Sequence, residues 1–151
     1  MQHTQPQQQI YKAAPEDFTA LAEVWEASVR ATHHFLSEAD IQFYKPLVRD
    51  EYLKLVEVYY VRDAKGQIAG FVGTADRKVE MLFIHPERRG EGIGKKLLQY
   101  AVQELQASAV DVNEQNEQAV GFYEHFGFRT ISRSELDSMG KPYPILHMQL
   151  P

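Results

Sequence analysis

The sequence HPERRGEGIGKK occupies residues 85–96 and follows an apolar run at residues 79–84. Apolar residues then recur at helical spacing, so the glycines of this stretch fall where a predicted strand turns into a predicted helix. Glycines allow close approach to the backbone, and the first N–H groups of a helix have no partner within that helix. Because the helix dipole adds positive potential, the stretch predicts a site for a phosphate or pyrophosphate group.

Basic residues strengthen this prediction because they stand in a chain whose net charge is -5. They are Arg88, Arg89, Lys95 and Lys96. The alternative interpretation is a tight turn with solvated cations. A P-loop would need glycine in place of Arg89 and serine or threonine in place of Lys96, and a dinucleotide motif would need glycine at Lys95 or Leu97. We therefore expect no nicotinamide, flavin or ordinary ATP site.

The remaining chain alternates predicted strands and helices around this stretch. Helices are expected to begin at Pro15 and Ser37, with Pro46 kinking or dividing the second one. Two further helices are expected at residues 92–106 and 116–125. Strands are expected at residues 9–13, 58–62, 67–75, 79–84, 109–112, 128–133 and 145–148. These elements predict one α/β domain over residues 1–151, with a mixed, mostly antiparallel sheet flanked by helices.

Composition excludes several other classes of protein. The chain has 151 residues, 44% of them hydrophobic, and no cysteine, which excludes disulfides, thiolate metal sites and a cysteine nucleophile. The acidic balance disfavours a general nucleic-acid binder.

The longest aliphatic or aromatic runs, such as residues 58–61, have four residues. With no membrane span or targeting signal expected, we place the protein in the cytoplasm. The Gln-rich residues 1–8 are expected to fray.

A second segment, VNEQNEQAVGFYEHFGF at residues 112–128, carries a polar face on a predicted helix. Asn116, Ala119 and Tyr123 are spaced by three and four residues, so they lie on one face of the helix. The small Ala119 leaves room between the two polar side chains, which suits a ligand channel. The alternative is that Tyr123 is an ordinary half-buried aromatic residue.

Together the two segments resemble the signatures of the GNAT superfamily of acetyl-CoA-dependent N-acetyltransferases, and the chain is similar to a bacterial branch of it. The first matches as Arg-x-x-Gly-x-Gly at Arg89, Gly92 and Gly94, and the second as Asn-x-x-Ala-x-x-hydrophobic-Tyr-x-x-x-Gly-Phe from Asn116. The resemblance implies the GNAT fold, acetyl-CoA as cofactor and coenzyme A as product. It also implies a general acid, Tyr123, which protonates the departing thiolate.

The same resemblance implies which residues bind the cofactor. The backbone of the strand before the glycine loop would hold the pantetheine arm and polarise the acetyl carbonyl. The implied cofactor-binding residues are Leu82, Phe83, Ile84, Arg88, Arg89, Gly90, Glu91, Gly92, Ile93, Gly94, Lys95, Asn116, Ala119 and Tyr123.

The expected reaction is direct transfer, in which a neutral amine attacks the acetyl carbonyl and backbone N–H groups hold the oxyanion. A lysine-like amine, with a pKa of about 10.4, must first lose a proton. Glu80 is the candidate base because strand alternation predicts that it shares a face with Leu82 and Ile84. The alternative is a solvated glutamate at the end of a strand.

Two adjacent histidines are candidate substrate contacts. His33 and His34 lie between the first two helices, where acceptor pockets of GNAT enzymes are often walled. Neighbouring helical side chains diverge by about 100°, and no metal-binding spacing is present, so no metal site is expected. Ser134, Glu135 and Asp137 on the late loop could meet a cationic amine, or they could lie in a solvated hairpin.

The sequence thus predicts an N-acetyltransferase that acts on a primary amine of a small molecule, a peptide or a protein lysine. The alternatives are a catalytically silent acyl-CoA-binding regulatory module and a partner-binding domain on the same scaffold. The protein is expected to be a monomer or a homodimer, with no membrane partner.

Overall fold

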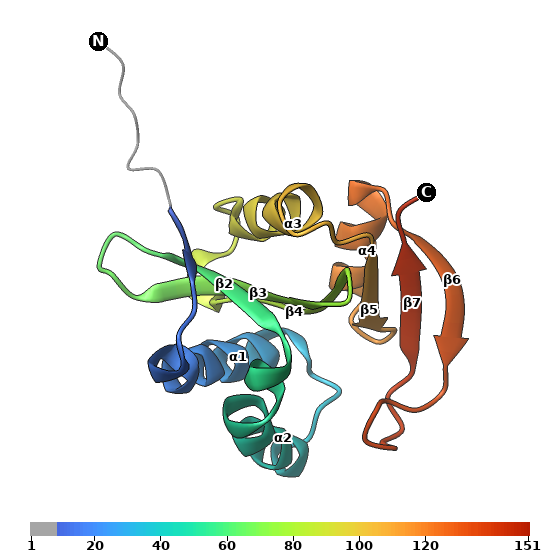
Figure 1. Ribbon diagram of the computed structural model, residues 1–151. Coiled ribbons are helices and arrows are strands. Elements are labelled where there is room, and N and C mark those ends of the chain that lie inside the picture. The colour runs from blue at the N-terminus through green and yellow to red at the C-terminus, as the bar shows by residue number, and fades with distance from the viewer. Residues whose placement is uncertain (1–8) are drawn as a thin grey trace.

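The structure is a computed structural model that describes residues 9–151, so the fraying expected of residues 1–8 lies outside it. Figure 1 shows the arrangement of its helices and strands. The helices are α1 (Phe18–Thr32), α2 (Glu38–Asp50), α3 (Ile93–Gln103) and α4 (Glu117–Phe126). The strands are β1 (Ile10–Lys12), β2 (Glu57–Arg62), β3 (Ile68–Ala75), β4 (Lys78–Ile84), β5 (Ala109–Asn113), β6 (Arg129–Ser134) and β7 (Ile145–Gln149).

The described strands form one sheet in the order β1-β2-β3-β4-β5-β7-β6. Every neighbouring pair is antiparallel except β4 and β5, which are parallel. Helices α1 and α2 cover one face and α3 and α4 the other (Figure 1). The predicted fold class, a mixed and mostly antiparallel sheet flanked by helices, is confirmed.

Each face of the sheet has its own apolar core. On the α1 and α2 side, Leu21 and Trp25 pack with Phe71 of β3. On the α3 and α4 side, Leu97 and Phe128 belong to the other cluster. Full burial of such a side chain stabilises the fold by about 1.5–3 kcal/mol, so the apolar stripes on the helices fix which face each helix buries.

Two irregularities in β4 open the middle of the sheet. The parallel pairing of β4 with β5 is confined to Lys78 with Ala109 and Val79 with Val110. Beside β3 the register shifts, because consecutive residues Gly73 and Thr74 pair with Met81 and Val79. Glu80 is therefore an extra, bulged residue, and such bulges bend a strand and redirect its side chains. The two halves of the sheet consequently diverge beyond Val79.

Of the two outcomes predicted for Pro46, a kink or a division of the second helix, the division is wrong, because α2 runs from Glu38 to Asp50 with Pro46 inside it. Proline removes a single backbone donor, and the helix continues to a final bond from Glu51 N–H to the Leu47 carbonyl. The predicted cap is confirmed, since Ser37 Oγ accepts a 3.1 Å hydrogen bond from Asp40 N–H. At the start of the chain, a short 3₁₀ turn at Pro15–Asp17 precedes α1.

Candidate functional site

A cavity of about 310 Å³ lies between the end of α1, the second half of β4, the glycine loop and α4. We call it the basic cavity, because Arg88, Arg89 and Lys95 line it and no Asp or Glu does so among the described residues. The predicted cofactor residues that line it are Leu82, Phe83, Ile84, Arg88, Arg89, Gly90, Gly92, Ile93, Gly94, Lys95, Asn116, Ala119 and Tyr123. Glu91 is not part of this lining.

The glycine loop presents backbone to this cavity. Gly90 and Gly92 have φ values of +81° and +78°, which L side chains rarely adopt, and Gly92 is the N-cap of α3. A Cβ at either glycine would meet no atom within 4 Å, so the loop backbone faces open space. The first turn of α3 holds no acidic residue. This helix N-terminus therefore fits an anionic diphosphate group.

Two of the three cations of the basic cavity, Arg88 and Arg89, have different environments. Arg88 forms ion pairs with Asp63 at 3.3 Å and with Glu91 at 3.6 Å. Arg89 donates a 3.1 Å hydrogen bond to Oε1 of Gln118 on α4. Arg88 is thus partly neutralised by carboxylates, while Arg89 keeps its full charge beside a neutral amide.

A second cavity of about 530 Å³ lies on the α1 and α2 side. We call it the acidic cavity, because its lining includes Glu80, Asp111 and Asp137 but no Lys or Arg among the described residues. Its aromatic lining residues are Trp25, Phe35, Tyr44, Tyr52, Phe83, Tyr123 and Tyr143. An apolar chain that ends in a cation matches this combination of rings and carboxylates.

The two cavities meet at a junction of residues that line both. These are His33, Leu82, Phe83, Asn116, Ala119 and Tyr123. A basic cavity and an acidic cavity therefore adjoin one another beside the tyrosine that the sequence singles out.

Tyr123 is buried at the junction, with 5% of its surface exposed. Its ring packs edge-on against Phe122 and Phe128, with centroids at 5.3 and 5.7 Å. Burial raises the pKa of the Tyr123 phenol above its ordinary value. The phenol thus stays protonated at neutral pH, as an unperturbed tyrosine also is, and has a proton to donate.

Asn116 lies about two turns before Tyr123 on the predicted face of α4. It is the N-cap of α4, and its Oδ1 accepts a 3.2 Å hydrogen bond from Ala119 N–H. The Asn116 amide therefore holds the start of the helix with its oxygen and directs its NH₂ group elsewhere.

The structure separates the two adjacent histidines. His33 follows α1 and lies at the junction, with Nε2 3.3 Å from Asn116 Nδ2 and Nδ1 2.8 Å from Thr32 Oγ1. Burial, together with the smaller effects of the charges of Arg89 and His34, lowers the pKa of His33 to about 4. His34 is exposed and lines neither cavity.

Glu80 lines the acidic cavity but not the junction. The bulge breaks the alternation on which its predicted common face with Leu82 and Ile84 depended. Met81 joins the α1 and α2 core, whereas Leu82 and Ile84 pack against the other core. Glu80 pairs instead with Lys78, at 3.2 Å.

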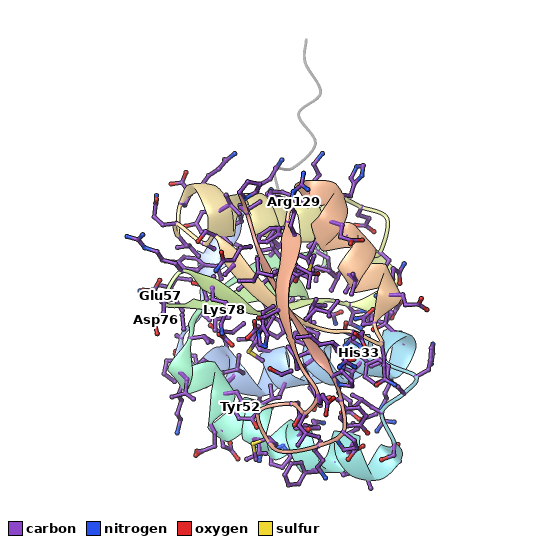
Figure 2. The ribbon with its side chains drawn as sticks, turned by 90° about the vertical axis from the view of Figure 1, so that its right-hand side faces the viewer. His33, Tyr52, Glu57, Asp76, Lys78 and Arg129 are labelled. Carbon is purple, nitrogen blue, oxygen red and sulfur yellow. The ribbon has the colours of Figure 1, made fainter. Side chains whose placement is uncertain are left out.

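Lys78 connects Glu80 to a chain of polar groups across the sheet. Its Nζ lies 2.8 Å from Asp111, and Asp111 lies 2.7 Å from His147 Nδ1. Ser134 Oγ lies 2.7 Å from His147 Nε2. Seen from the β6 and β7 edge, Lys78 and His33 are on opposite sides of these strands (Figure 2). The Glu80 pair is therefore separate from the junction histidine.

The loop between β6 and β7 closes the outer side of the acidic cavity against α2. Tyr44 Oη donates a 2.5 Å hydrogen bond to Asp137 Oδ2, and Tyr143 Oη donates one to Asp40. The Tyr52 hydroxyl is buried in the same wall and has no hydrogen-bond partner among residues 9–151. A buried hydroxyl of this kind is available to a ligand or to water.

Several lining residues were missed in the sequence. Ser28, Thr32, Gln118 and Phe122 line the basic cavity, and Asp111 and Tyr143 the acidic one. Ser28 had a signal, because a serine stands within the buried apolar stripe of α1. Asp40 and Tyr143 are 103 residues apart, and no local pattern joins them.

Within residues 9–151, no group of three His, Asp or Glu side chains is arranged to hold a metal ion. In the same part of the chain, no helix combines the length and the apolar character needed to cross a membrane.

Comparison with known proteins places this geometry in a family. The family model described as "Acetyltransferase (GNAT) domain" matches residues 22–149. The chain is similar to a protein of Salmonella typhimurium named peptidyl-lysine N-acetyltransferase YjaB, with 39% identity over 94% of this chain and 97% of the relative. A protein of the same name from Escherichia coli is 38% identical over 92% of this chain and 94% of that protein.

Solved structures agree with these matches. The solution structure of apo YjaB from Escherichia coli has a TM-score of 0.83 and 38% identity, and covers 93% of this chain and 95% of that chain. A crystal structure of an N-acetyltransferase from Thermoplasma acidophilum in complex with coenzyme A has a TM-score of 0.71 at 22% identity. It covers 93% of this chain and 98% of that chain, and shares the fold.

Proposed function

The chain belongs to the GNAT family of acetyltransferases, and on that premise we propose that it acetylates lysine side chains of proteins or peptides at the junction of its two cavities, with Tyr123 as the general acid. The observation that carries the proposal is the meeting of a basic and an acidic cavity at Tyr123. An anionic cofactor and a cationic acceptor each find complementary charge there.

The protein is an acetyltransferase that acts on amines, as its named relatives at 38–39% identity are. No observation favours the alternative of a silent acyl-CoA-binding module. The cytoplasmic location, the absence of a metal and the oligomeric state remain predictions from the sequence.

Acetyl-CoA supplies the activated acetyl group as a thioester. Arg89, Lys95 and the N-terminus of α3 would hold its diphosphate, because they present positive charge and open backbone to the basic cavity. Gly90 and Gly92 give the loop the conformation that exposes these N–H groups. This assignment uses the residues that the family resemblance implies.

The backbone of β4 provides the other polar groups. Beyond Val79 the strand has no β5 partner, while Leu82, Phe83 and Ile84 pair with β3. In an antiparallel pair, alternate residues point their N–H and C=O groups away from the partner strand, here toward the gap. These groups would hold the pantetheine arm and the developing oxyanion.

Tyr123 would protonate the departing thiolate. Its phenol is protonated at neutral pH, as an ordinary tyrosine with a pKa of about 10 is, and burial raises its pKa further. The two phenylalanine rings packed against it keep the side chain in one position. A positioned acid of this kind contributes about 10²–10⁴-fold to the rate.

The acidic cavity would receive the acceptor. Glu80 and Asp111 are already paired with Lys78, so Asp137 is the carboxylate that would attract an ammonium group. The aromatic walls accommodate the four methylenes of a lysine side chain. The names of the relatives support the same acceptor. Glu80, the candidate base from the sequence, stays a candidate in the wall of this cavity.

Release of free thiol from acetyl-CoA would test this function. We expect release that depends on lysine peptides and is lost when the lysine side chain is replaced by norleucine, which has no amine. A panel with polyamines, free amino acids and N-terminal amines is the comparison. Faster release with a polyamine than with any lysine peptide would contradict the proposed acceptor while leaving the acetyltransferase class intact.

A further inference from the structure

The hydrogen bonds around His33 fix the position of its ring proton. Thr32 Oγ1 donates to the Ser28 carbonyl at 2.8 Å, so its proton is already used there. It must therefore accept from His33 Nδ1, which lies 2.8 Å away. On the Nδ1 side of the ring, the hydrogen bonds end at the Ser28 carbonyl oxygen, which can only accept.

The other ring nitrogen is fixed in the same way. Asn116 Oδ1 accepts from Ala119 N–H, so the nitrogen end of that amide faces His33. An amide NH₂ can only donate, and His33 Nε2 must accept from it. His33 is thus a neutral imidazole with its proton on Nδ1 and its lone pair directed to the junction. The contact from Asn116 is long, at 3.3 Å, and is easily replaced by a stronger donor.

The other junction residues cannot take a proton at neutral pH. Leu82, Phe83 and Ala119 have no titratable group, the Asn116 amide is not basic, and Tyr123 is already protonated. Glu80 lies outside the junction and is paired with Lys78. Among the described residues that line both cavities, His33 alone has a lone pair able to accept a proton.

We propose that His33 Nε2 is the proton acceptor for the ammonium group of the acceptor, directly or across one water molecule. This inference rests on the proposed function and replaces Glu80 as the base. The acceptor nitrogen gives one proton to His33 and then forms the new C–N bond. The C–S bond breaks, the thiolate takes the Tyr123 proton, and the amide nitrogen loses its surplus proton, which restores the tyrosine. His33 returns its proton to solvent, so one proton is released per turnover.

The basic cavity couples this base to the cofactor. The charged or titratable groups that act on His33 are Arg89 from the glycine loop and His34 from its own segment, and Arg88, Lys95 and Tyr123 line the same cavity. The positive charge of Arg89 disfavours a proton on His33. A diphosphate paired with Arg89 would cancel that charge, so binding of the cofactor would raise the basicity of His33. The amine would then be deprotonated once the acetyl donor is in place.

The variant His33→Gln tests the proposal because it removes the base but keeps an acceptor for Asn116. With a lysine peptide at pH 7, we expect kcat to fall by about 100-fold. We expect coenzyme A to bind as tightly as before. The deficit should shrink as the pH approaches the lysine pKa of about 10.4, where the amine is already neutral. His125→Gln, the same substitution at an exposed histidine that lines neither cavity, is the matched control.

A second acceptor separates proton transfer from positioning. A lysine analogue with sulfur in place of the γ-methylene has nearly the same shape but a lower amine pKa. For this acceptor, the His33→Gln deficit should vanish at a lower pH than it does for lysine. An equal deficit at every pH and with both acceptors would overturn the proposal and leave His33 a positioning role. A pH-dependent deficit in Glu80→Gln instead would assign the base to Glu80.

Nitrogen NMR of the imidazole provides a readout independent of activity. We expect the proton of neutral His33 on Nδ1, and a rise in the His33 pKa when coenzyme A is added. A proton on Nε2 would contradict the inference even in an active acetyltransferase. Wild-type protein that acetylates no amine at all would refute the proposed function, and with it the role of His33, whatever its tautomer.

Discussion

Tyr44 on α2 and Asp137 on the loop between β6 and β7 are 93 residues apart and share a 2.5 Å hydrogen bond from the phenol to Oδ2. The other carboxylate oxygen accepts hydrogen bonds from the backbone N–H groups of Met139 and Lys141, each at 2.9 Å. One carboxylate therefore shapes the loop and joins it to the helix that walls the acidic cavity.

Loss of the Tyr44–Asp137 hydrogen bond should weaken binding of the acceptor and leave binding of the cofactor unchanged. A hydrogen bond to a charged group is worth about 1.5–3 kcal/mol. We therefore expect Tyr44→Phe to raise the KM for a lysine peptide by about tenfold. Coenzyme A binding should be unchanged, because Tyr44 does not line the basic cavity. Tyr59→Phe, which removes a hydroxyl from a tyrosine outside both cavities, is the control. Weaker coenzyme A binding in Tyr44→Phe would show that the two cavities are not independent.

Tyr123→Phe should reduce kcat by about 100-fold while the protein stays folded. The ring keeps its contacts with Phe122 and Phe128, and only the proton donor is lost. Thiol release gives the rate, and titration calorimetry with coenzyme A gives the affinity, which should not change. Retention of the wild-type kcat would exclude Tyr123 as the general acid.

Gly92→Ala should weaken coenzyme A binding by about tenfold, equivalent to about 1.4 kcal/mol. Alanine is strained at φ +78°, so the loop must move and displace its N–H groups. The control is Gly66→Ala in the β2–β3 turn, where φ is +81° and the space around a Cβ is equally open.

Both glycine variants should lose about 1–2 kcal/mol of unfolding free energy from the same strain. Gly92→Ala alone should lose affinity, because Gly66 does not line the basic cavity. Equal coenzyme A affinity in the two variants would argue against the glycine loop as the diphosphate site.

The free energy of unfolding should decrease as the pH is lowered through a range set by the titration of His33. The unfolded histidine titrates near 6.5 and the folded one near 4, so between these values only the unfolded state takes up the proton. The free energy of unfolding should therefore decrease by about 3 kcal/mol as the pH falls from 6.5 to 4. Urea unfolding at several pH values measures this change.

His33→Gln should flatten that slope, whatever its stability at pH 7. Arg89 and His34 are the charged or titratable groups that lower the His33 pKa, and both remain in the variant. Carboxylates such as Glu38, whose pKa of about 2 reflects its hydrogen bonds to Arg30 and Gln42, lose their contribution at lower pH in both proteins. Parallel slopes in the variant and the wild type would show that His33 is not the group responsible.

Local patterns predicted the elements and the cofactor side of the site. The glycine loop, the apolar stripe of α1 and the face of Asn116, Ala119 and Tyr123 each depend on neighbours within a few residues. Such short-range relations can be predicted from a sequence, because side chains repeat at fixed periods along a helix or a strand. The residues predicted to bind the cofactor therefore line one cavity, with Glu91 the exception.

Long-range geometry accounts for what the sequence did not predict. The bulge at Glu80 is defined by how β4 pairs with β3, and the sequence of β4 alone does not indicate which residue is the extra one. His33 and His34 could not be distinguished in the sequence. The contact that distinguishes His33 is made with Asn116 at the start of α4, which is 83 residues away along the chain. The outer wall of the acidic cavity depends on the contact between Asp137 and Tyr44, which forms only in the folded chain.

The short seam between β4 and β5 also constrains how this protein can vary during evolution. Only Val79 with Val110 and Lys78 with Ala109 join the two halves of the sheet at that point. Substitutions that lengthened the pairing would bring the strands together and close the gap on which both cavities depend. Selection at the seam should therefore act against better strand pairing, so a more regular sheet would be a less active enzyme.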